Sequence, residues 1–183
     1  MLLESARVEL ARYRPTDGRE HDYLARLLDL LETPEPWSRS QFRPGHLTAS
    51  AFVLSPAGDA VLLIFHRKLG IWIQPGGHIE PTDPSLEQAA RREVAEEVGV
   101  DLSDPAPAAI FDVDVHAIPA RKTEPEHEHF DVRFCFQAKS LVFAASSEVM
   151  DARWVELAGI DQVTADESVL RAARKLPGLA AKT

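Results

Sequence analysis

Hydrophobic positions recur with two different periods along the chain, and the changes of period predict the order of its elements. Apolar residues spaced three or four apart predict helices, whereas short apolar runs bounded by Gly, Pro and Asp predict strands. The predicted helices cover residues 2–13, a second run ending near residue 31, a run from about 83–85 to 98, and 165–175. The predicted strands cover residues 46–54, 60–66, 71–74, 111–116, 129–134 and 152–157.

The third predicted helix carries glutamates on the face that its apolar residues also occupy. Its apolar stripe consists of Leu86, Ala90, Val94 and Val98. At about 100° per residue, Glu93 and Glu97 fall within this stripe, and Glu96 lies about 60° to its side. Like charges so spaced repel, and removing them from water costs several kcal/mol per ion unless something compensates. The pattern therefore predicts a divalent cation beside the three carboxylates.

Two features favour this cation over a merely solvated acidic face, which is the commoner explanation of a glutamate-rich helix. The acidic arc overlaps the apolar arc, and Gly76 and Gly77 come just before the helix. A backbone without side chains approaches a ligand closely or offers a carbonyl to a metal. Carboxylates, a carbonyl and waters form an oxygen-only site, which suits Mg²⁺ or Mn²⁺ rather than zinc. For the start of the helix, Asp83 and Ser85 are the alternative capping residues, and Gly99 is expected to end it.

These residues resemble the signature of the Nudix hydrolases, G-x5-E-x7-R-E-U-x-E-E-x-G-U, in which U is a bulky aliphatic residue. Residues 92–100 match the second half of this signature at every fixed position. The first half departs from it. Counting from Gly77, Asp83 stands where the family has Glu, and eight residues rather than seven separate Asp83 from Arg92. The insertion falls where the loop enters the helix, so it puts the role of Asp83 in doubt and leaves the carboxylate cluster undisturbed.

The resemblance implies an α/β fold, a Nudix-like α/β/α sandwich with a mixed β-sheet. Residues 1–36 are expected to form an N-terminal helical extension packed on the core, and residues 37–183 the Nudix hydrolase domain. The alternative use of the leading segment is a dimer contact, which would make the protein a homodimer.

The resemblance also implies a reaction, the hydrolysis of a diphosphate linkage in a nucleoside diphosphate joined to another group, assisted by Mg²⁺ or Mn²⁺. Carried over by position, Glu93, Glu96 and Glu97 are the expected metal ligands, together with the Gly76 carbonyl. Arg92 is expected to orient the glutamates by charge-assisted hydrogen bonds. The group that takes the proton of the attacking water stays open between Glu93, Glu96 and an acidic residue in a later loop.

Two later strands alternate polar and apolar residues cleanly, over residues 111–116 and 129–134. Their polar residues either form the wet face of a hairpin or line the substrate cleft. Candidate substrate contacts are Asp112, Asp114, His116, Asp131 and Arg133 on these strands, with Arg67 and His78 near the signature.

The segment that connects these strands, residues 117–128, is long for a hairpin, and long loops in compact domains are often functional. Nudix hydrolases often draw a further acid from a loop after the signature, so Glu124, Glu126 and Glu128 are candidates for an extra base or metal ligand, with no choice among them. His127 and His129 form a His-x-His pair, which would suit a transition metal if a third ligand such as His116 met them in space.

The bulk properties fit a small enzyme of 183 residues, 45% of them hydrophobic, with one good core. A net charge of -9 argues against a nucleic-acid binder, because neutralising a nucleic-acid backbone requires a basic face. The single cysteine, Cys135, excludes an intrachain disulfide framework and suits a reducing cytoplasm, which is the expected location. No long apolar span or signal-like start is present, so neither a membrane anchor nor export is expected.

Two other functions would suit the same scaffold. An isopentenyl-diphosphate-isomerase-like enzyme also binds a diphosphate through a divalent metal, but it needs a reactive Cys and Glu, and Cys135 lies in an apolar run. A non-catalytic nucleotide-sensing module is disfavoured because all three signature glutamates are present and no DNA-binding helix-turn-helix segment is recognisable. The substrate stays open among ADP-ribose, nucleoside triphosphates, dinucleoside polyphosphates and coenzyme A derivatives.

Overall fold

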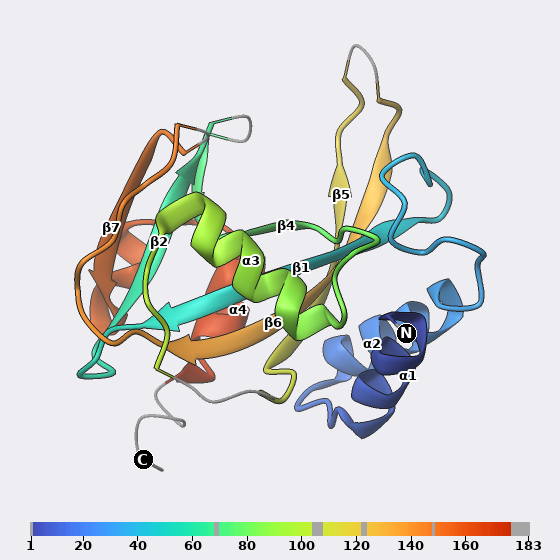
Figure 1. Ribbon diagram of the computed structural model, residues 1–183, viewed down its shortest axis with the longest axis horizontal. Helices are drawn as coiled ribbons and strands as arrows, with labels where there is room; N and C mark the ends of the chain where they lie inside the picture. Colours follow the sequence, from blue (N-terminus) through green and yellow to red (C-terminus); the bar gives the residue numbers. More distant parts are fainter. Residues whose placement is uncertain (1, 68–69, 104–107, 122–123, 148, 177–183) are drawn as a thin grey trace. The chain divides into compact units, whose positions relative to one another are not determined.

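The computed structural model (Figure 1) describes residues 2–67, 70–103, 108–121, 124–147 and 149–176. The chain divides into two compact units. The first unit draws on Met1–Ser50, Gly77–Arg91 and Ala109–Phe134, and the second draws on Ala51–Gly76, Arg92–Ala108 and Cys135–Thr183. The units interleave along the chain, so a unit is not a single stretch of sequence.

The elements follow the predicted order. The helices are α1 (Leu2–Arg12), α2 (Gly18–Leu30), α3 (Leu86–Val98) and α4 (Glu167–Ala173), with the 3₁₀ helix η1 (Leu157–Gln162) before α4. The strands are β1 (Gly45–Leu54), β2 (Ala60–His66), β3 (Ile71–Ile73), β4 (Gly76–His78), β5 (Asp112–Ile118), β6 (His127–Gln137) and β7 (Asp151–Glu156). The strand order is β3-β2-β1-β6-β5, with β4 paired to β1 and β7 paired to β2. The predicted α/β class is therefore confirmed, and among the described residues the short strand β4 and the 3₁₀ helix η1 were not expected.

The first unit contains two helices and the β5–β6 hairpin. Helix α1 buries Leu2, Ala6 and Leu10, which are four residues apart and so share one face. Helix α2 begins after Asp17, whose side chain accepts a hydrogen bond from the Glu20 amide at 2.8 Å. Strands β5 and β6 pair antiparallel over seven residues each, from Asp112 opposite Arg133 to Ile118 opposite His127.

The second unit is built around β2, which pairs antiparallel with β3 and β7 and also pairs with the end of β1. Val61, Leu62 and Leu63 of β2 are completely shielded from solvent. Such strands read as continuous apolar runs because both of their faces are covered. Helix α4 begins after Asp166, whose side chain accepts a hydrogen bond from the Val169 amide at 3.0 Å.

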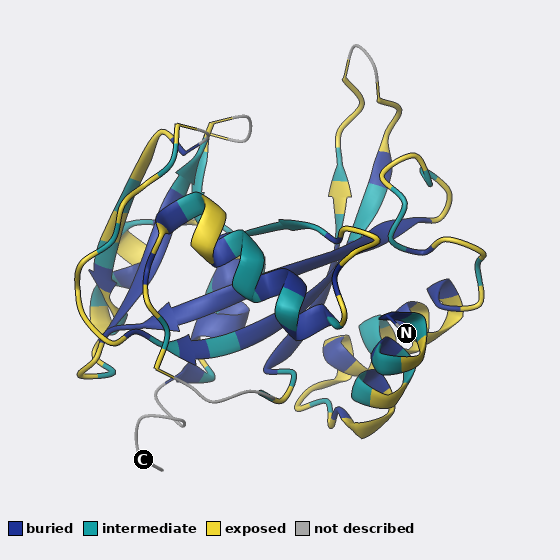
Figure 2. Ribbon diagram, in the orientation of Figure 1, coloured by how far each residue is buried: buried dark blue, intermediate teal, exposed yellow. Residues whose placement is uncertain are grey.

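Helix α3 begins after a capping serine and ends at a glycine, as the sequence predicted. Ser85 rather than Asp83 is the cap, since its hydroxyl accepts a hydrogen bond from the Gln88 amide at 3.2 Å. Asp83 instead accepts the Glu80 amide at 2.8 Å and so closes the turn before the helix. Gly99 has a φ of 55°, a left-handed conformation that ends the helix without a Cβ clash. In Figure 2 buried segments of α3, in dark blue, alternate along the helix with teal and yellow segments that are more exposed.

None of the helices in the described part of the chain is long and apolar enough to cross a bilayer. The longest, α2 and α3, have 13 residues each, whereas a membrane span requires about 20 predominantly apolar residues.

Candidate functional site

Helix α3 presents an arginine that bridges two of the signature glutamates. The Arg92 Nη1 donates hydrogen bonds to Glu93 Oε1 at 2.9 Å and to Glu96 Oε2 at 3.1 Å. The side chain of Glu93 is only 14% exposed, whereas that of Glu96 is 58% exposed. The guanidinium therefore lies between one largely buried and one solvent-facing carboxylate, and it offsets the repulsion between them.

Glu97 is anchored to the glycine strand β4. Its Oε2 accepts a hydrogen bond from the Gly76 amide at 2.9 Å. Its own backbone carbonyl accepts the Ser146 amide at 2.8 Å, which also fixes the last turn of the helix. The backbone of Gly76 and the carboxylate of Glu97 are thus neighbours, as a shared cation would require, although the contact between them is made by the Gly76 N–H.

The donors of this group are all oxygens, from Glu93, Glu96 and Glu97. Hard divalent cations such as Mg²⁺ and Mn²⁺ prefer such ligands, so the chemistry of the donor set fits them. We call these three residues and Arg92 the glutamate cluster.

The polar residues of β5 and β6 form a buried ion network in the first unit. Arg133 is 2% exposed, and its Nε donates to Asp131 Oδ2 at 2.8 Å. Its Nη1 and Nη2 lie 3.3 Å from Oδ2 of Asp112 and from Oδ2 of Asp114, respectively. Burial alone would lower the pKa of Arg133, but the three carboxylates outweigh it and raise that pKa.

Strand β1 supplies two further donors to this network. Thr48 Oγ1 and Ser50 Oγ donate to the two carboxylate oxygens of Asp131 at 3.1 and 2.7 Å. Because Asp112, Asp131 and Arg133 are all buried, the interpretation of this hairpin face as solvated is wrong. Substrate contact by Asp131 or Arg133 stays a prediction.

The same polar face continues into five histidines, which we call the histidine cluster. They are His46, His78, His116, His127 and His129. His116 lies directly opposite His129 in the β5–β6 register, and their ring centroids are 5.6 Å apart. His78 lies 5.1 Å from His46 between ring centroids, and its Nδ1 is 3.0 Å from Arg39 Nη2. His116 Nδ1 is 3.0 Å from Asp114 Oδ2, which links the histidines to the ion network.

Two of these histidines have lowered pKa values. Burial, together with the neighbouring His116, His46, His78 and His127, lowers the pKa of His129 to about 2. Burial is also the main reason why the pKa of His46 is lowered. In both rings these surroundings favour the neutral imidazole over the protonated form.

Two of the remaining candidates have partners of their own, and the charge of Glu124 also acts on His46, whose pKa it raises against the effect of burial. Arg67 donates to the Ser147 carbonyl at 3.2 Å, and Glu128 forms an ion pair with Arg26. Glu124 and Glu126 are exposed in the segment that connects β5 and β6. Their predicted roles in phosphate contact, proton transfer or metal binding stay predictions.

Sequence reasoning missed the contribution of β1 to both groups. His46, Thr48 and Ser50 lie at every second position of this strand, so they share one face. This alternation of polar residues is the signal that would have placed them beside the polar face of β6.

The chain is similar in sequence and in fold to proteins of one known family. The NUDIX domain model matches residues 44–175, which is well over half of the chain. The chain belongs to the Nudix family. Among curated proteins, no sequence matches it closely enough to count as a relative.

Solved Nudix structures share the fold. A hydrolase of the NUDIX family from Clostridium perfringens is 25% identical, with 73% of this chain and 97% of that chain covered and a TM-score of 0.55. The NUDIX domain of Shewanella oneidensis NrtR, complexed with ADP ribose, is 24% identical over 87% and 97% of the two chains, with a TM-score of 0.53. An Ap4A hydrolase from C. elegans is 18% identical over 75% and 98%, also with a TM-score of 0.53.

Arg133→Met should unfold the protein far more easily than a matched exposed change. Removal of the guanidinium leaves three buried aspartates without their cation, which costs roughly 3–5 kcal/mol of unfolding free energy. The control Arg174→Met removes an exposed ion pair with Glu167, which is worth at most about 1 kcal/mol. Urea unfolding of the two variants and the wild type measures both losses, and equal losses would contradict the buried role of Arg133.

Protonation of His129 in the unfolded state should lower the free energy of unfolding of this Nudix protein in mild acid. Its folded pKa of about 2 lies below the unfolded value of 6.5, so the unfolded state binds the additional proton. The contribution of His129 to stability is complete above pH 6.5 and falls as the pH drops from there towards 2. Between pH 8 and pH 5 the loss amounts to about 2 kcal/mol.

Denaturant unfolding of wild type and His129→Gln at both pH values tests this prediction. The variant should lose about 2 kcal/mol less than the wild type between pH 8 and pH 5. His21→Gln, on the exposed surface of α2, is the control and should follow the wild type. Parallel pH curves for all three proteins would show that His129 takes up its proton in the folded state.

Proposed function

We propose that this Nudix protein hydrolyses a diphosphate linkage in a nucleoside diphosphate joined to another group, with Mg²⁺ or Mn²⁺ as its cofactor. The observation that carries the proposal is the glutamate cluster, in which three carboxylates lie on one part of α3 and Arg92 and Gly76 hold them. Arg92 supplies one positive charge to three carboxylates, and a divalent ion would turn the remaining repulsion among them into binding energy.

In this proposal Glu93, Glu96 and Glu97 hold the cation, together with the Gly76 carbonyl. The chemistry that Mg²⁺ or Mn²⁺ supplies at such a site is neutralisation of the diphosphate charge and a lowered pKa of bound water. Arg92 orients Glu93 and Glu96, so it acts as a positioning residue. The proton of the attacking water passes to Glu93, to Glu96 or to an acidic residue of the later loop, for which Glu124, Glu126 and Glu128 are the candidates.

The substrate class rests on similarity to the solved relatives. One of them is named an Ap4A hydrolase, and another was solved with ADP ribose. Both compounds contain phosphate groups joined by an anhydride bond and carry a nucleoside. A negatively charged chain of net charge -9 accepts such anions when part of their charge is neutralised by a cation.

The chain consists, in this proposal, of a helical extension followed by the Nudix domain. The family match begins at residue 44, so we propose that residues 1–36, with α1 and α2, are an N-terminal extension of a Nudix domain formed by residues 37–183. Within the first unit, Arg26 of α2 pairs with Glu128 and lies 5.3 Å from the ring centre of Phe130. These contacts support packing of the extension on β6.

Glu97→Gln should abolish hydrolysis while leaving the fold intact. The amide oxygen of Gln still accepts the Gly76 N–H, but it lacks the negative charge that binds a cation. Loss of several kcal/mol of transition-state stabilisation corresponds to a decrease in kcat of roughly 100-fold or more. Chromatographic separation of nucleotide products after incubation with ADP-ribose, Ap4A, nucleoside triphosphates or coenzyme A measures this loss.

The matched control is Glu156→Gln, an exposed glutamate at the end of β7 in the same unit. It should keep the wild-type rate, and both variants should keep the wild-type melting temperature within a few degrees. Wild-type activity of Glu97→Gln at saturating Mg²⁺ would refute the metal role of the glutamate cluster.

A further inference from the structure

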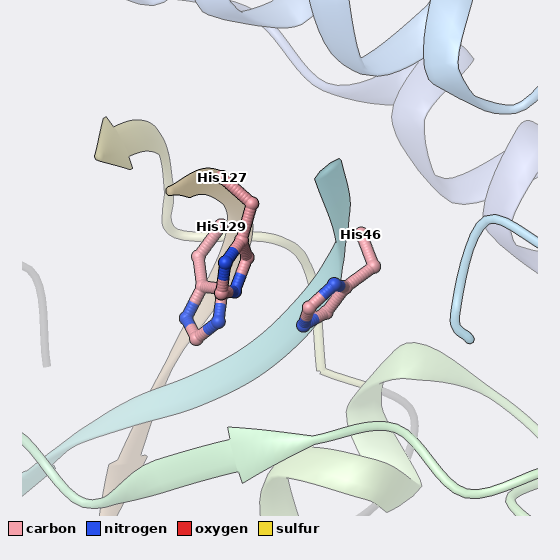
Figure 3. A group of neighbouring side chains, drawn as sticks. All are labelled: His46, His127 and His129. Atoms are coloured by element: carbon pink, nitrogen blue, oxygen red, sulfur yellow. The ribbon is translucent and has the colours of Figure 1, made fainter. Parts of the chain in front are cut away.

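Three members of the histidine cluster bring ring nitrogens close to one another. They are His46 on β1 and His127 and His129 on β6, all in the first unit (Figure 3). One nitrogen from each ring can be chosen so that all three lie within 4.8 Å of one another. The ring centroids are 4.8 to 5.2 Å apart. The sequence suggested only the His127-x-His129 pair, and His46 supplies the third nitrogen.

The hydrogen bonds of two of these rings fix which nitrogen is available. His46 Nδ1 lies 3.2 Å from the Gln41 carbonyl oxygen, and His127 Nδ1 lies 2.8 Å from the Pro125 carbonyl oxygen. A carbonyl oxygen only accepts, so each Nδ1 carries the proton and donates. In the neutral ring the Nε2 lone pair is then left for a ligand. Metal-bound histidines show this same arrangement, with the second ring nitrogen donating to a backbone carbonyl.

The Nε2 of His46 lacks any partner among the described residues, although it is buried. His46 itself is 1% exposed. A buried polar atom without a hydrogen bond costs about 1–3 kcal/mol, so a structure that keeps one usually has a use for it. A metal ion bound to this nitrogen would remove the deficit.

The backbone at Gly45 brings the two strands close enough for this arrangement. A Cβ built on Gly45 would lie 2.0 Å from the carbonyl oxygen of Glu128, which stands between His127 and His129. Gly45 also has a φ of 145°, which residues with side chains rarely adopt. The glycine before His46 therefore permits a close backbone contact at the point where the three rings meet.

The other two histidines of the cluster are engaged differently. His78 Nδ1 faces the guanidinium of Arg39, which only donates, so His78 accepts there and carries its proton on Nε2. His116 is joined to Asp114 through its Nδ1. The three remaining rings form an all-nitrogen set, whereas the glutamate cluster offers oxygens alone.

We propose that His46, His127 and His129 bind a first-row transition-metal ion of the Zn²⁺ class, at a site separate in its ligands from the glutamate cluster. Imidazole nitrogen suits Zn²⁺, Cu²⁺ and Ni²⁺, whereas Mg²⁺ prefers oxygen. Zn–N bonds of about 2.0–2.1 Å in a tetrahedral site place the nitrogens about 3.3 Å apart, so small rotations of the rings close the site. Three protein ligands leave a fourth coordination position for water or another small ligand.

The assignment stands on geometry. One nitrogen from each of the three rings lies within 4.8 Å of the other two, and the buried Nε2 of His46 has no hydrogen-bond partner among the described residues.

Binding of Zn²⁺ by the full chain tests the assignment without reference to hydrolysis. The chain is stripped of metal with a chelator and titrated with Zn²⁺ against a chromophoric competitor, in excess Mg²⁺ to occupy the glutamate cluster. One Zn²⁺ per chain is expected for the wild type and for Glu97→Gln. His46→Gln and His127→Gln should lose more affinity than the roughly 10–100-fold that removal of a second-shell partner costs.

His21→Gln is the matched control, since His21 is exposed on α2 and lies outside the cluster. It should bind as the wild type does. Equal Zn²⁺ affinity in His127→Gln and the wild type would overturn the assignment, and so would loss of Zn²⁺ binding in Glu97→Gln alone. These measurements record Zn²⁺ binding and not hydrolysis. The zinc site and the proposed hydrolase activity are therefore tested independently.

A measurement on the wild type alone covers the case in which a buried histidine variant does not fold. Nitrogen NMR of the chain labelled in its histidine rings resolves each Nε2 and Nδ1. Zn²⁺ should shift the signals of His46, His127 and His129 and leave those of His21 in place. Unchanged signals from all three rings at saturating Zn²⁺ would refute the site.

Discussion

A single buried cation among three carboxylates holds the polar face of the first unit together. Arg133 on β6 contacts Asp131 on its own strand and Asp112 and Asp114 on β5. A slip of one residue in either strand would turn these side chains to opposite faces and leave the charges buried without partners. The ion network therefore fixes the register of β5 against β6, with Asp112 opposite Arg133 and Asp114 opposite Asp131.

The histidine cluster depends on that register. The pairing that sets Asp114 opposite Asp131 also sets His116 opposite His129, two residues further along the same face. Thr48 and Ser50 tie β1 to Asp131, and His46 lies two residues before Thr48 on the same side of its strand. The charge network thus sets which imidazoles meet further along the same face.

The glutamate cluster also contains an arginine paired with carboxylates, but it is more exposed to solvent than the ion network of Arg133. In both groups an arginine contacts more than one carboxylate, but Arg133 is almost fully buried and Arg92 has a side chain that is 21% exposed. Buried pairs are costly to break, whereas partly exposed pairs are weaker and adjust to a ligand. We attribute a structural role to the first arrangement and a ligand-binding role to the second.

The sequence predicted the parts of the chain whose pattern is local. Helix α3, its glycine end and its glutamates follow from a period of 3.6 residues and from capping chemistry, and β2 follows from an uninterrupted apolar run. The meeting of His46 with His127 and His129 depends on contacts between residues far apart in the chain, which one sequence does not reveal. The burial of Asp112 and Arg133 was missed for a related reason, because alternation shows which residues share a face but not what covers it.

The central claim is that water attacks a phosphorus atom of a diphosphate linkage at the glutamate cluster. Phosphorus NMR of products formed by the wild type in ¹⁸O-enriched water, with Mg²⁺ and separately with Mn²⁺, tests it most directly. The account predicts cleavage of a nucleoside diphosphate derivative, with ¹⁸O in one phosphate product, seen as an isotope-shifted phosphorus signal. Products without ¹⁸O, or binding of these compounds without any turnover, would contradict it.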